Sequence, residues 1–171
     1  MIQKIKTIIQ TLMFVTIIAF AGGCYYMYEQ QNMALAGENH IALPDFEHTN
    51  NQQFLDNVNQ CVDYIYHTTT DVYPVNREIL LAQAALESGW GNSRFALEGK
   101  NLFGIRTYDL TEPHMLPSNN PKKWGVRVYM HECDSVQHYI DILNNGGAYE
   151  KYRELRDNGE TDSLKYVETL G

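Results

Sequence analysis

The hydrophobic pattern of this chain is mainly helical. Apolar residues recur at helical spacing from about Asn51 to His67, and the stripe predicted to be buried consists of Phe54, Val58, Cys61, Val62 and Ile65. Three β-branched threonines at 68–70 follow and end the pattern. The sequence therefore predicts a core helix at the start of the folded part of the chain.

A second, shorter helix is predicted to end at Gly89. Asn76 can cap its N-terminus, and Val75 and Leu80 have the spacing of a hydrophobic staple. The residues expected to face the core follow the i, i+3, i+4 and i+7 pattern and are Ile79, Ala82, Gln83 and Leu86. Glu87 falls in the last turn of this helix.

The position of Glu87 suits a proton donor. A carboxylate at the end of a helix meets the negative pole of the helix dipole, which disfavours its charged form, and Trp90 and Phe103 would add apolar surroundings. Hydrolysis of a glycosidic bond needs such an acid, because the leaving sugar oxygen takes a proton as the bond breaks. A lone glutamate at a helix end is more commonly a solvated surface residue, so the position alone does not establish catalysis.

Further helices are predicted on either side of an alternating segment. A short one covers 93–97, and a longer one covers 131–145, where Asp134 and Gln137 have capping-box spacing. Another covers 149–156, in which Tyr149 and Tyr152 are expected to be packing residues. The last apolar pattern is made of Leu164, Val167 and Leu170.

The segment from Arg106 to Met130 alternates with period two instead. Residues 105–108 and 124–129 flank a loop rich in Pro and Asn, which predicts a two-stranded hairpin or a small irregular lobe. This lobe carries two carboxylates, Asp109 and Glu112, and concentrates basic residues at Arg106, Lys122, Lys123 and Arg127. Such residues could contact an anionic ligand, although exposed hairpins are commonly charged. The predicted fold is mainly α with a small β lobe.

One long string in the chain resembles a known family. AQAALESGWGNSRFA, followed closely by NLFGI, resembles the glucosaminidase domains of glycoside hydrolase family 73. It resembles the Bax-type proteins even more closely, and the later string AYEKYRELR adds to that likeness. The similarity spans about residues 72–156. It implies a lysozyme-like α+β fold, and it makes Glu87 the catalytic acid. Bax-type proteins continue further at the C-terminus than this chain does.

The resemblance also implies roles for other residues. Family members place a second acidic residue in the lobe, for which Glu112 ranks ahead of Asp109. The NLFG turn lines the floor of the substrate groove, so Asn101 and Phe103 would contact sugar, although Phe103 fits a core position equally well. The further residues expected to bind substrate are Trp90, Tyr108 and Tyr129. No metal or cofactor is implied.

The activity implied by the resemblance is that of an endo-β-N-acetylglucosaminidase acting on peptidoglycan. It would cleave the β-1,4 bond on the reducing side of N-acetylglucosamine. Two alternatives remain. One is a muramidase or lytic transglycosylase on the same fold, for which one glutamate suffices. The other is a membrane-tethered module that binds wall glycan, or scaffolds a complex, without cutting it.

Composition and charge bound these expectations. The chain has 171 residues, of which 44% are hydrophobic, which suits one domain with a substantial core. Its formal net charge is −8, and this argues against nucleic acid as a partner, because such binders normally carry a basic patch.

The N-terminus has the features of an export signal. Lys4 and Lys6 precede an apolar run from Thr11 to Gly23, so residues 1–28 are predicted to be a signal or anchor. Three interpretations compete: a cleaved signal, a lipoprotein signal using Cys24, and an uncleaved membrane anchor. Residues 29–48 are predicted to be a tether and residues 49–171 the glucosaminidase-like domain. All three interpretations place the domain outside the cytoplasm, in the cell envelope or secreted.

Export affects the interpretation of the cysteines. Cys61 and Cys133 lie on two predicted helices, and an oxidising compartment would allow them to pair. The favoured interpretation is nevertheless two buried free thiols, because the sequence does not fix the distance between them. A zinc site of His131, Cys133 and His138 is disfavoured, since its spacing matches no common ligand pattern.

Overall fold

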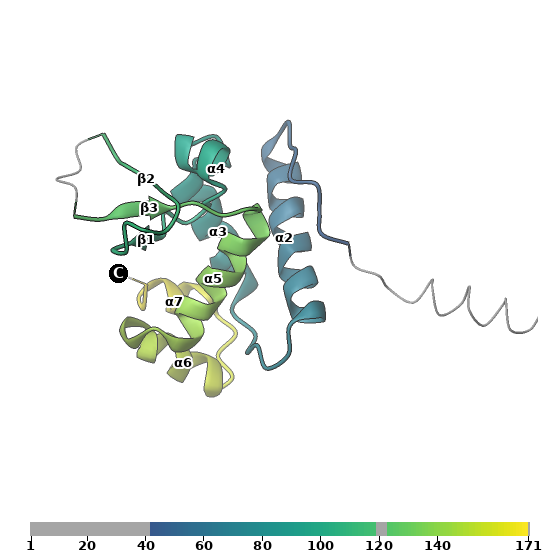
Figure 1. Cartoon of the computed structure of the whole chain (residues 1–171). Coiled ribbons are helices and arrows are strands. Elements are labelled where there is room, and N and C mark those ends of the chain that lie inside the picture. The colour runs from purple at the N-terminus through teal and green to yellow at the C-terminus, as the bar shows by residue number, and fades with distance from the viewer. Residues whose placement is uncertain (1–41, 119–122, 171) are drawn as a thin grey trace, which may run out of the picture. The chain divides into compact units, whose positions relative to one another are not determined.

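The computed structural model of the chain describes residues 42–118 and 123–170, which belong to one compact unit spanning 41–171 (Figure 1). The predictions for residues 1–41 and for Lys122 concern residues outside the described part. The helices are α2 (Asn51–Thr68), α3 (Arg77–Ser88), α4 (Arg94–Gly99), α5 (Glu132–Asn145), the 3-10 turn η1 (Gly147–Tyr149), α6 (Glu150–Asp157) and α7 (Ser163–Val167). The strands are β1 (Arg106–Thr107), β2 (His114–Met115) and β3 (Gly125–Arg127). The prediction of a mainly helical fold with a small β lobe is confirmed.

The core is built around α2 and α5, which lie side by side (Figure 1). The predicted stripe of α2 is confirmed, because Phe54, Val58 and Ile65 are all buried. A disulfide joins Cys61 of α2 to Cys133 of α5. The prediction of two free thiols is therefore wrong. Packing of α2 against α5 brings the two Cα atoms to 5.0 Å, within the range that a disulfide spans.

The inward face of α3 differs from the prediction. Its N-terminus forms as expected, since the Asn76 side chain accepts a hydrogen bond from the Ile79 N–H. Leu86, however, is 76% exposed, and the buried residues are Ile79, Leu80, Ala84, Ala85 and Ser88. The small residues Ala84, Ala85 and Ser88 form much of the inward face, so α3 can approach its neighbours closely. Such a face is not recognised from the spacing of large apolar residues.

The β lobe is a three-stranded antiparallel sheet in the order β1-β3-β2. The two predicted alternating segments do pair, with Arg106 opposite Val126. The loop between them contributes a third strand, in which His114 lies opposite Arg127. The two-stranded prediction was therefore incomplete, because a strand of two residues is too short to show a period.

The ends of the last helices also differ from expectation. His131 caps α5 by accepting from the Cys133 N–H at 3.0 Å, and Asp134 accepts from the His131 N–H at 2.9 Å, so the capping box lies three residues earlier than predicted. In α7 the buried residue is Tyr166, which packs on Tyr152 with ring centroids 4.9 Å apart. Two of the apolar residues predicted to pack there are exposed, Leu164 by 76% and Val167 by 54%.

Residues 42–49, which we call the strap, precede α2 and lie against the domain. The Pro44 carbonyl lies 3.1 Å from His131 Nε2, and the Glu47 carbonyl accepts from Asn57 Nδ2 at 3.0 Å. Most of the strap belongs to the segment predicted to be a tether. Among the described residues, no helix combines the length and apolar character needed to cross a bilayer.

Candidate active site

Glu87 lies in the last turn of α3, on an exposed surface. The helix ends at Gly89, whose φ of 59° is left-handed and whose N–H donates to the carbonyls of Ala85 and Leu86. Ser88 is fully buried beside it; its hydroxyl donates to the Ala84 carbonyl and accepts from the Gly91 N–H at 2.7 Å. These bonds fix the backbone on both sides of Glu87. Its carboxylate is therefore presented to solvent from a rigid helix end.

The corner after Glu87 depends on Gly91. Its φ is +77°, and a Cβ there would lie 2.7 Å from His48 Cε1 and 2.9 Å from a ring carbon of Phe54.

We expect Gly91→Ala to lower the free energy of unfolding by about 3 kcal/mol, because alanine would be strained in the left-handed region and its Cβ would overpack these two side chains. Gly104→Ala is the control, since its φ is +63° but nothing lies within 4 Å of the added Cβ. Urea denaturation measures both, and equal losses would show that the contacts of Gly91 are unimportant.

The NLFG turn is held together by the side chain of Asn101. Asn101 is 1% exposed, and its Nδ2 donates to the Ile105 and Arg127 carbonyls, both at 2.9 Å. Its Oδ1 accepts from the N–H groups of Phe103 and Ile105. Every polar atom of this side chain is thus directed at backbone, so Asn101 shapes the turn. Phe103 is 8% exposed and belongs to the core cluster.

Tyr139 of α5 packs on the NLFG turn. Its ring stacks on Phe103 with centroids 4.1 Å apart. Burial raises the pKa of the Tyr139 hydroxyl above its ordinary value, and Tyr149, Tyr152 and the carboxylate of Glu87 raise it further. Tyr139 therefore stays protonated and is a neutral neighbour of Glu87. Its contact with Phe103 was not predicted from the sequence.

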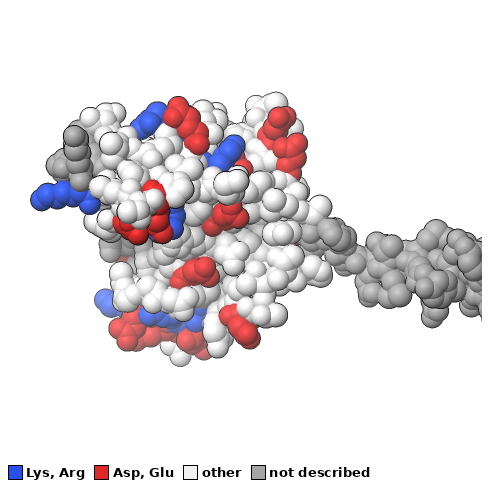
Figure 2. Space-filling model, viewed as in Figure 1, with Lys and Arg blue, Asp and Glu red and all other residues white. Residues whose placement is uncertain are grey.

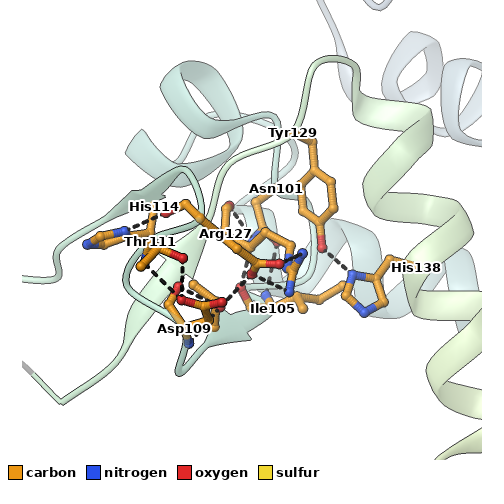
Figure 3. A network of polar contacts seen from close by, with 10 residues as sticks. Asn101, Ile105, Asp109, Thr111, His114, Arg127, Tyr129 and His138 are labelled. Carbon is orange, nitrogen blue, oxygen red and sulfur yellow. Dashed lines mark hydrogen bonds and ion pairs between the residues drawn. The ribbon is translucent and has the colours of Figure 1, made fainter.

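Glu112 in the lobe is held by Arg127 and Thr107, and Figure 3 shows Arg127 within the polar network of this lobe. One Arg127 nitrogen lies 2.7 Å from Glu112 Oε2, and the other donates to Oε1 at 3.2 Å. The Thr107 hydroxyl also donates to Oε2, at 2.8 Å. The two side chains are 36% and 30% exposed, for Glu112 and Arg127. A two-pronged guanidinium contact fixes the orientation of this carboxylate.

Asp109 lies in the same lobe but has a local role. Its Oδ1 accepts from the Thr111 hydroxyl at 2.6 Å and from the Thr111 N–H at 2.9 Å. These two hydrogen bonds lower the pKa of the exposed Asp109 carboxyl below its ordinary value. Figure 3 shows Asp109 and Thr111 close together at the edge of the network. Asp109 is therefore a weaker base than an ordinary aspartate and stabilises its own turn.

The predicted aromatic residues fall in different places. Tyr108 is 73% exposed, and Trp90 is 37% exposed with its ring edge-on to Phe54. Tyr129 is partly buried, and its hydroxyl lies 2.8 Å from His138 Nδ1, as Figure 3 shows. Of the basic residues, Arg106 stacks on Trp124 and Arg127 pairs with Glu112.

The partly buried position of His138 predicts a pH effect on stability. Burial, followed by Arg127, lowers the pKa of His138, while Asp141 and Glu112 act in the opposite direction. Because the pKa is lower in the folded state, the unfolded chain takes up the proton first as pH falls below about 6.5, and stability is lost. We expect His138→Gln to reduce the fall in Tm between about pH 7.5 and 5. His67→Gln, at an exposed site of α2, is the control and should leave that fall unchanged.

Comparison with known proteins assigns the family. The model of the family described as mannosyl-glycoprotein endo-beta-N-acetylglucosaminidase matches residues 64–170, which is more than half of the chain. The chain belongs to this glucosaminidase family, glycoside hydrolase family 73. The family membership predicted from the string around Glu87 is thereby confirmed.

Individual relatives of this chain match over shorter stretches. A putative endo-beta-N-acetylglucosaminidase of Streptococcus pneumoniae is 51% identical over 39 residues, which are 23% of this chain and 6% of that protein. The exo-glucosaminidase LytG of Bacillus subtilis is 40% identical over 55 residues, 32% of this chain and 18% of that protein. The matches thus cover less than a fifth of either relative. Among solved structures, the catalytic domain of the autolysin Auto from Listeria monocytogenes aligns with a TM-score of 0.42 and 21% identity, covering 84% of this chain and 89% of that one.

One cluster of metal-ligand residues lies elsewhere in the glucosaminidase domain. The ligand atoms of Cys61, His131 and Cys133 lie within 4.8 Å of one another. Both sulfurs are bonded in the disulfide, however, so neither is the thiolate that a zinc site would need. His131 instead caps α5 and contacts the strap.

The candidate site of this family member thus has two parts. Glu87 is exposed at the end of α3, Phe103 stacks on Tyr139 in the core, and Asp109 and Glu112 sit in hydrogen-bond networks of the lobe. Sequence reasoning missed the Arg127 partner of Glu112. The available signal was weak: two residues of opposite charge in separate segments of one lobe.

Proposed function

We propose that this chain is a peptidoglycan hydrolase that cleaves the β-1,4 bond on the reducing side of N-acetylglucosamine. The observation that carries the proposal is that the family match, residues 64–170, includes a glutamate presented to solvent at a rigid helix end. Nothing in the packing of α3 requires a carboxylate at this exposed position. Glu87 would donate its proton to the leaving sugar oxygen.

The proposed arrangement is lysozyme-like, with the glycan strand passing between the end of α3 and the lobe. Trp90, Tyr108 and Tyr129 offer aromatic faces or hydroxyls to the sugars, and the first two are well exposed. Asn101 and Phe103 act from beneath, by fixing the floor on which the sugar would rest. No cofactor is required for this chemistry.

Glu112 is the preferred second carboxylate. Its orientation is set by Arg127 and Thr107, whereas Asp109 is engaged with Thr111 in its own turn. Glu112 would either activate water, or orient the substrate's acetamido group while that group acts as the nucleophile. In both cases a carboxylate fixed in one orientation serves better than one that rotates freely.

We expect Glu112→Gln to lower kcat roughly 100-fold, as loss of a catalytic acid or base commonly does. Asp109→Asn should lower it less than about threefold, because Thr111 can still bond to the amide oxygen of the new side chain. Initial rates of glycan cleavage measure both variants. A severe loss in Asp109→Asn with little effect of Glu112→Gln would reverse the assignment.

The products of the reaction test the proposed function. Purified peptidoglycan is digested with the full-length protein, and the new sugar ends are identified by mass spectrometry. Reducing N-acetylglucosamine ends support the proposal. N-acetylmuramic or anhydro ends would assign a muramidase or a lytic transglycosylase instead. Absence of new ends on several walls, with a folded protein, would favour a glycan-binding module.

The proposed substrate places the domain outside the cytoplasm. The disulfide between Cys61 and Cys133 supports this, since such bonds persist mainly in oxidising compartments. A tether to the membrane through residues 1–28 is part of the same proposal. Fractionation of cells, with and without a detergent wash of the membranes, would distinguish a tethered protein from a secreted one.

A further inference from the structure

Trp90 has an unusual backbone conformation for a bulky residue. Its φ is 59°, in the left-handed region, where the side chain of an L-residue crowds its own backbone. The glycines on either side share this region, with φ of 59° at Gly89 and 77° at Gly91. Strained residues of this kind persist only where neighbouring groups hold them, and they are common at binding and catalytic sites. The groups that hold Trp90, three residues after Glu87, are therefore of functional interest.

The main-chain groups of Trp90 are held from two directions. Its N–H donates to the Ala85 carbonyl of α3 at 2.8 Å. Its carbonyl accepts from Asn92 Nδ2 at 3.1 Å and from His48 Nε2 at 3.0 Å. Ala85 and Asn92 belong to the same corner as Trp90, whereas His48 belongs to the strap, 42 residues earlier in the chain. His48 thus connects a distant segment to the corner that follows Glu87.

His48 is itself fixed by aromatic rings. Its ring lies edge-on to Phe54 of α2 and to Phe46 of the strap, with centroids 5.4 and 6.3 Å apart, and the indole of Trp90 lies edge-on to the same Phe54. Gly91 leaves room for the imidazole, since a Cβ there would lie 2.7 Å from His48 Cε1. Because a carbonyl can only accept a hydrogen bond, His48 Nε2 carries the proton in its contact with Trp90. Packing therefore orients the imidazole as a donor to Trp90 before any ligand binds.

Loss of the His48 contact is expected to release Trp90. The strain of one left-handed residue and the net contribution of one hydrogen bond are of similar size, so the bond from His48 can offset that strain. Without this bond, Trp90 can relax toward ordinary backbone angles, which would turn its indole away from its present position. The indole is 37% exposed, so a ligand meets only the part of the ring that this conformation presents.

The orientation of this ring matters for a neutral ligand. N-acetylglucosamine is uncharged, so its binding depends on aromatic contacts and hydrogen bonds. Figure 2 shows acidic and basic side chains interspersed over one face of the domain, rather than a patch of one sign that would attract a charged polymer. For such a sugar, the way in which an exposed indole is held affects affinity directly.

We propose that His48 is a positioning residue for Trp90 in the binding of wall glycan. By holding the Trp90 carbonyl, it keeps the exposed part of the indole in the orientation that meets a sugar ring near Glu87. This inference rests on the proposed function, in which Trp90 is a sugar contact. His48 precedes residues 64–170, so the family match assigns it no role.

Cleavage kinetics with the full-length protein test this role. His48→Leu removes the donor and keeps an apolar side chain between the rings. We expect it to raise KM for glycan stripped of peptides about five- to tenfold, the size of one lost aromatic contact, with kcat within about twofold of wild type. His48→Gln, whose amide can still donate to the Trp90 carbonyl, should keep KM within about twofold of wild type.

A second anchor of the strap provides the control. Asn57 Nδ2 donates to the Glu47 carbonyl at 3.0 Å, the same length as the His48 bond. Asn57→Leu should therefore loosen the strap to a similar extent but leave KM unchanged, because this bond does not hold Trp90. In a Trp90→Ala protein, His48→Leu should raise KM no further, since a residue that acts through the indole has no effect once the indole is gone. A further rise there, or an equal rise in Asn57→Leu, would overturn the proposal.

Quenching of tryptophan fluorescence tests the positioning without any substrate. The chain has two tryptophans, so Trp124→Phe leaves Trp90 as the sole emitter. In that background we expect His48→Leu to raise the acrylamide quenching constant roughly twofold, because an indole that is no longer held becomes more exposed. Asn57→Leu and His48→Gln should leave the constant unchanged. Unchanged quenching in His48→Leu would overturn the proposal, whatever KM does.

These measurements also separate the proposal from the function on which it rests. If wild type cleaves glycan, and His48→Leu changes quenching but not KM, the role of His48 in glycan binding fails alone. If wild type cleaves no glycan, the proposed function fails and this role fails with it, even where quenching shows that His48 holds Trp90. Thermal unfolding establishes that each variant is folded, and His48→Ala takes the place of His48→Leu if the leucine variant is not.

Discussion

Glu87→Gln is expected to lower the rate of glycan cleavage roughly 1,000-fold, the effect of removing a general acid. Glutamine keeps the size and polarity of the side chain but cannot deliver the proton that the leaving oxygen requires. Because Glu87 is exposed at the end of α3, the fold should tolerate the change, with stability within about 0.5 kcal/mol of wild type. Release of reducing ends from purified wall measures the rate.

The control for this prediction is Glu98→Gln on α4. Glu98 is an exposed carboxylate, 63% exposed, whose contact with Arg94 at 3.8 Å lies within one helix. The same chemical change there should leave activity unchanged, because exposed pairs of this kind contribute little. If Glu87→Gln keeps more than about a tenth of the wild-type rate, Glu87 is not the proton donor.

Removal of the disulfide should have the largest effect on stability. Cys61 and Cys133 are 72 residues apart in sequence, so the bond closes a long loop in the unfolded chain. In the chain-entropy model its loss costs roughly 4 kcal/mol. For a domain of this size that corresponds to a fall in Tm of more than about 10 °C. We expect this for Cys61→Ala with Cys133→Ala, measured by thermal unfolding.

Two comparisons support the interpretation of that result. Wild type unfolded in the presence of dithiothreitol should lose a similar amount of stability, because the same bond is absent. Cys24→Ser should unfold like wild type, since it leaves both members of the pair in place. A double variant as stable as oxidised wild type would mean that the bond contributes nothing to the folded state.

Much of the helical framework was predictable from local signals. The stripe of α2 and the Asn76 cap of α3 are short-range features, and both were identified correctly. The inward face of α3 was not, because Ala84, Ala85 and Ser88 are small and carry little hydrophobic signal. Their burial depends on how closely α3 packs in the domain, which only the tertiary structure determines.

The same distinction between local signals and long-range contacts applies to the site residues. The string around Glu87 was sufficient to identify the family, because it is long and local. The partners of the site residues were hidden, since they come from distant segments: Tyr139 reaches Phe103 from α5, and Arg127 reaches Glu112 from β3. The pairing of Cys61 with Cys133 is a third long-range contact of this kind.

The amide of Asn101 has a consequence for how the two parts of the site tolerate substitution. Its Nδ2 group joins the NLFG turn to β3 by donating to the Arg127 carbonyl. The side chain of Arg127 in turn holds Glu112. Aspartate would have no donor for the two carbonyls, and alanine would leave four backbone groups without their partner. A single buried side chain thus joins the NLFG turn to β3, and homologues lacking this amide would need a different means of holding the lobe in register with that turn.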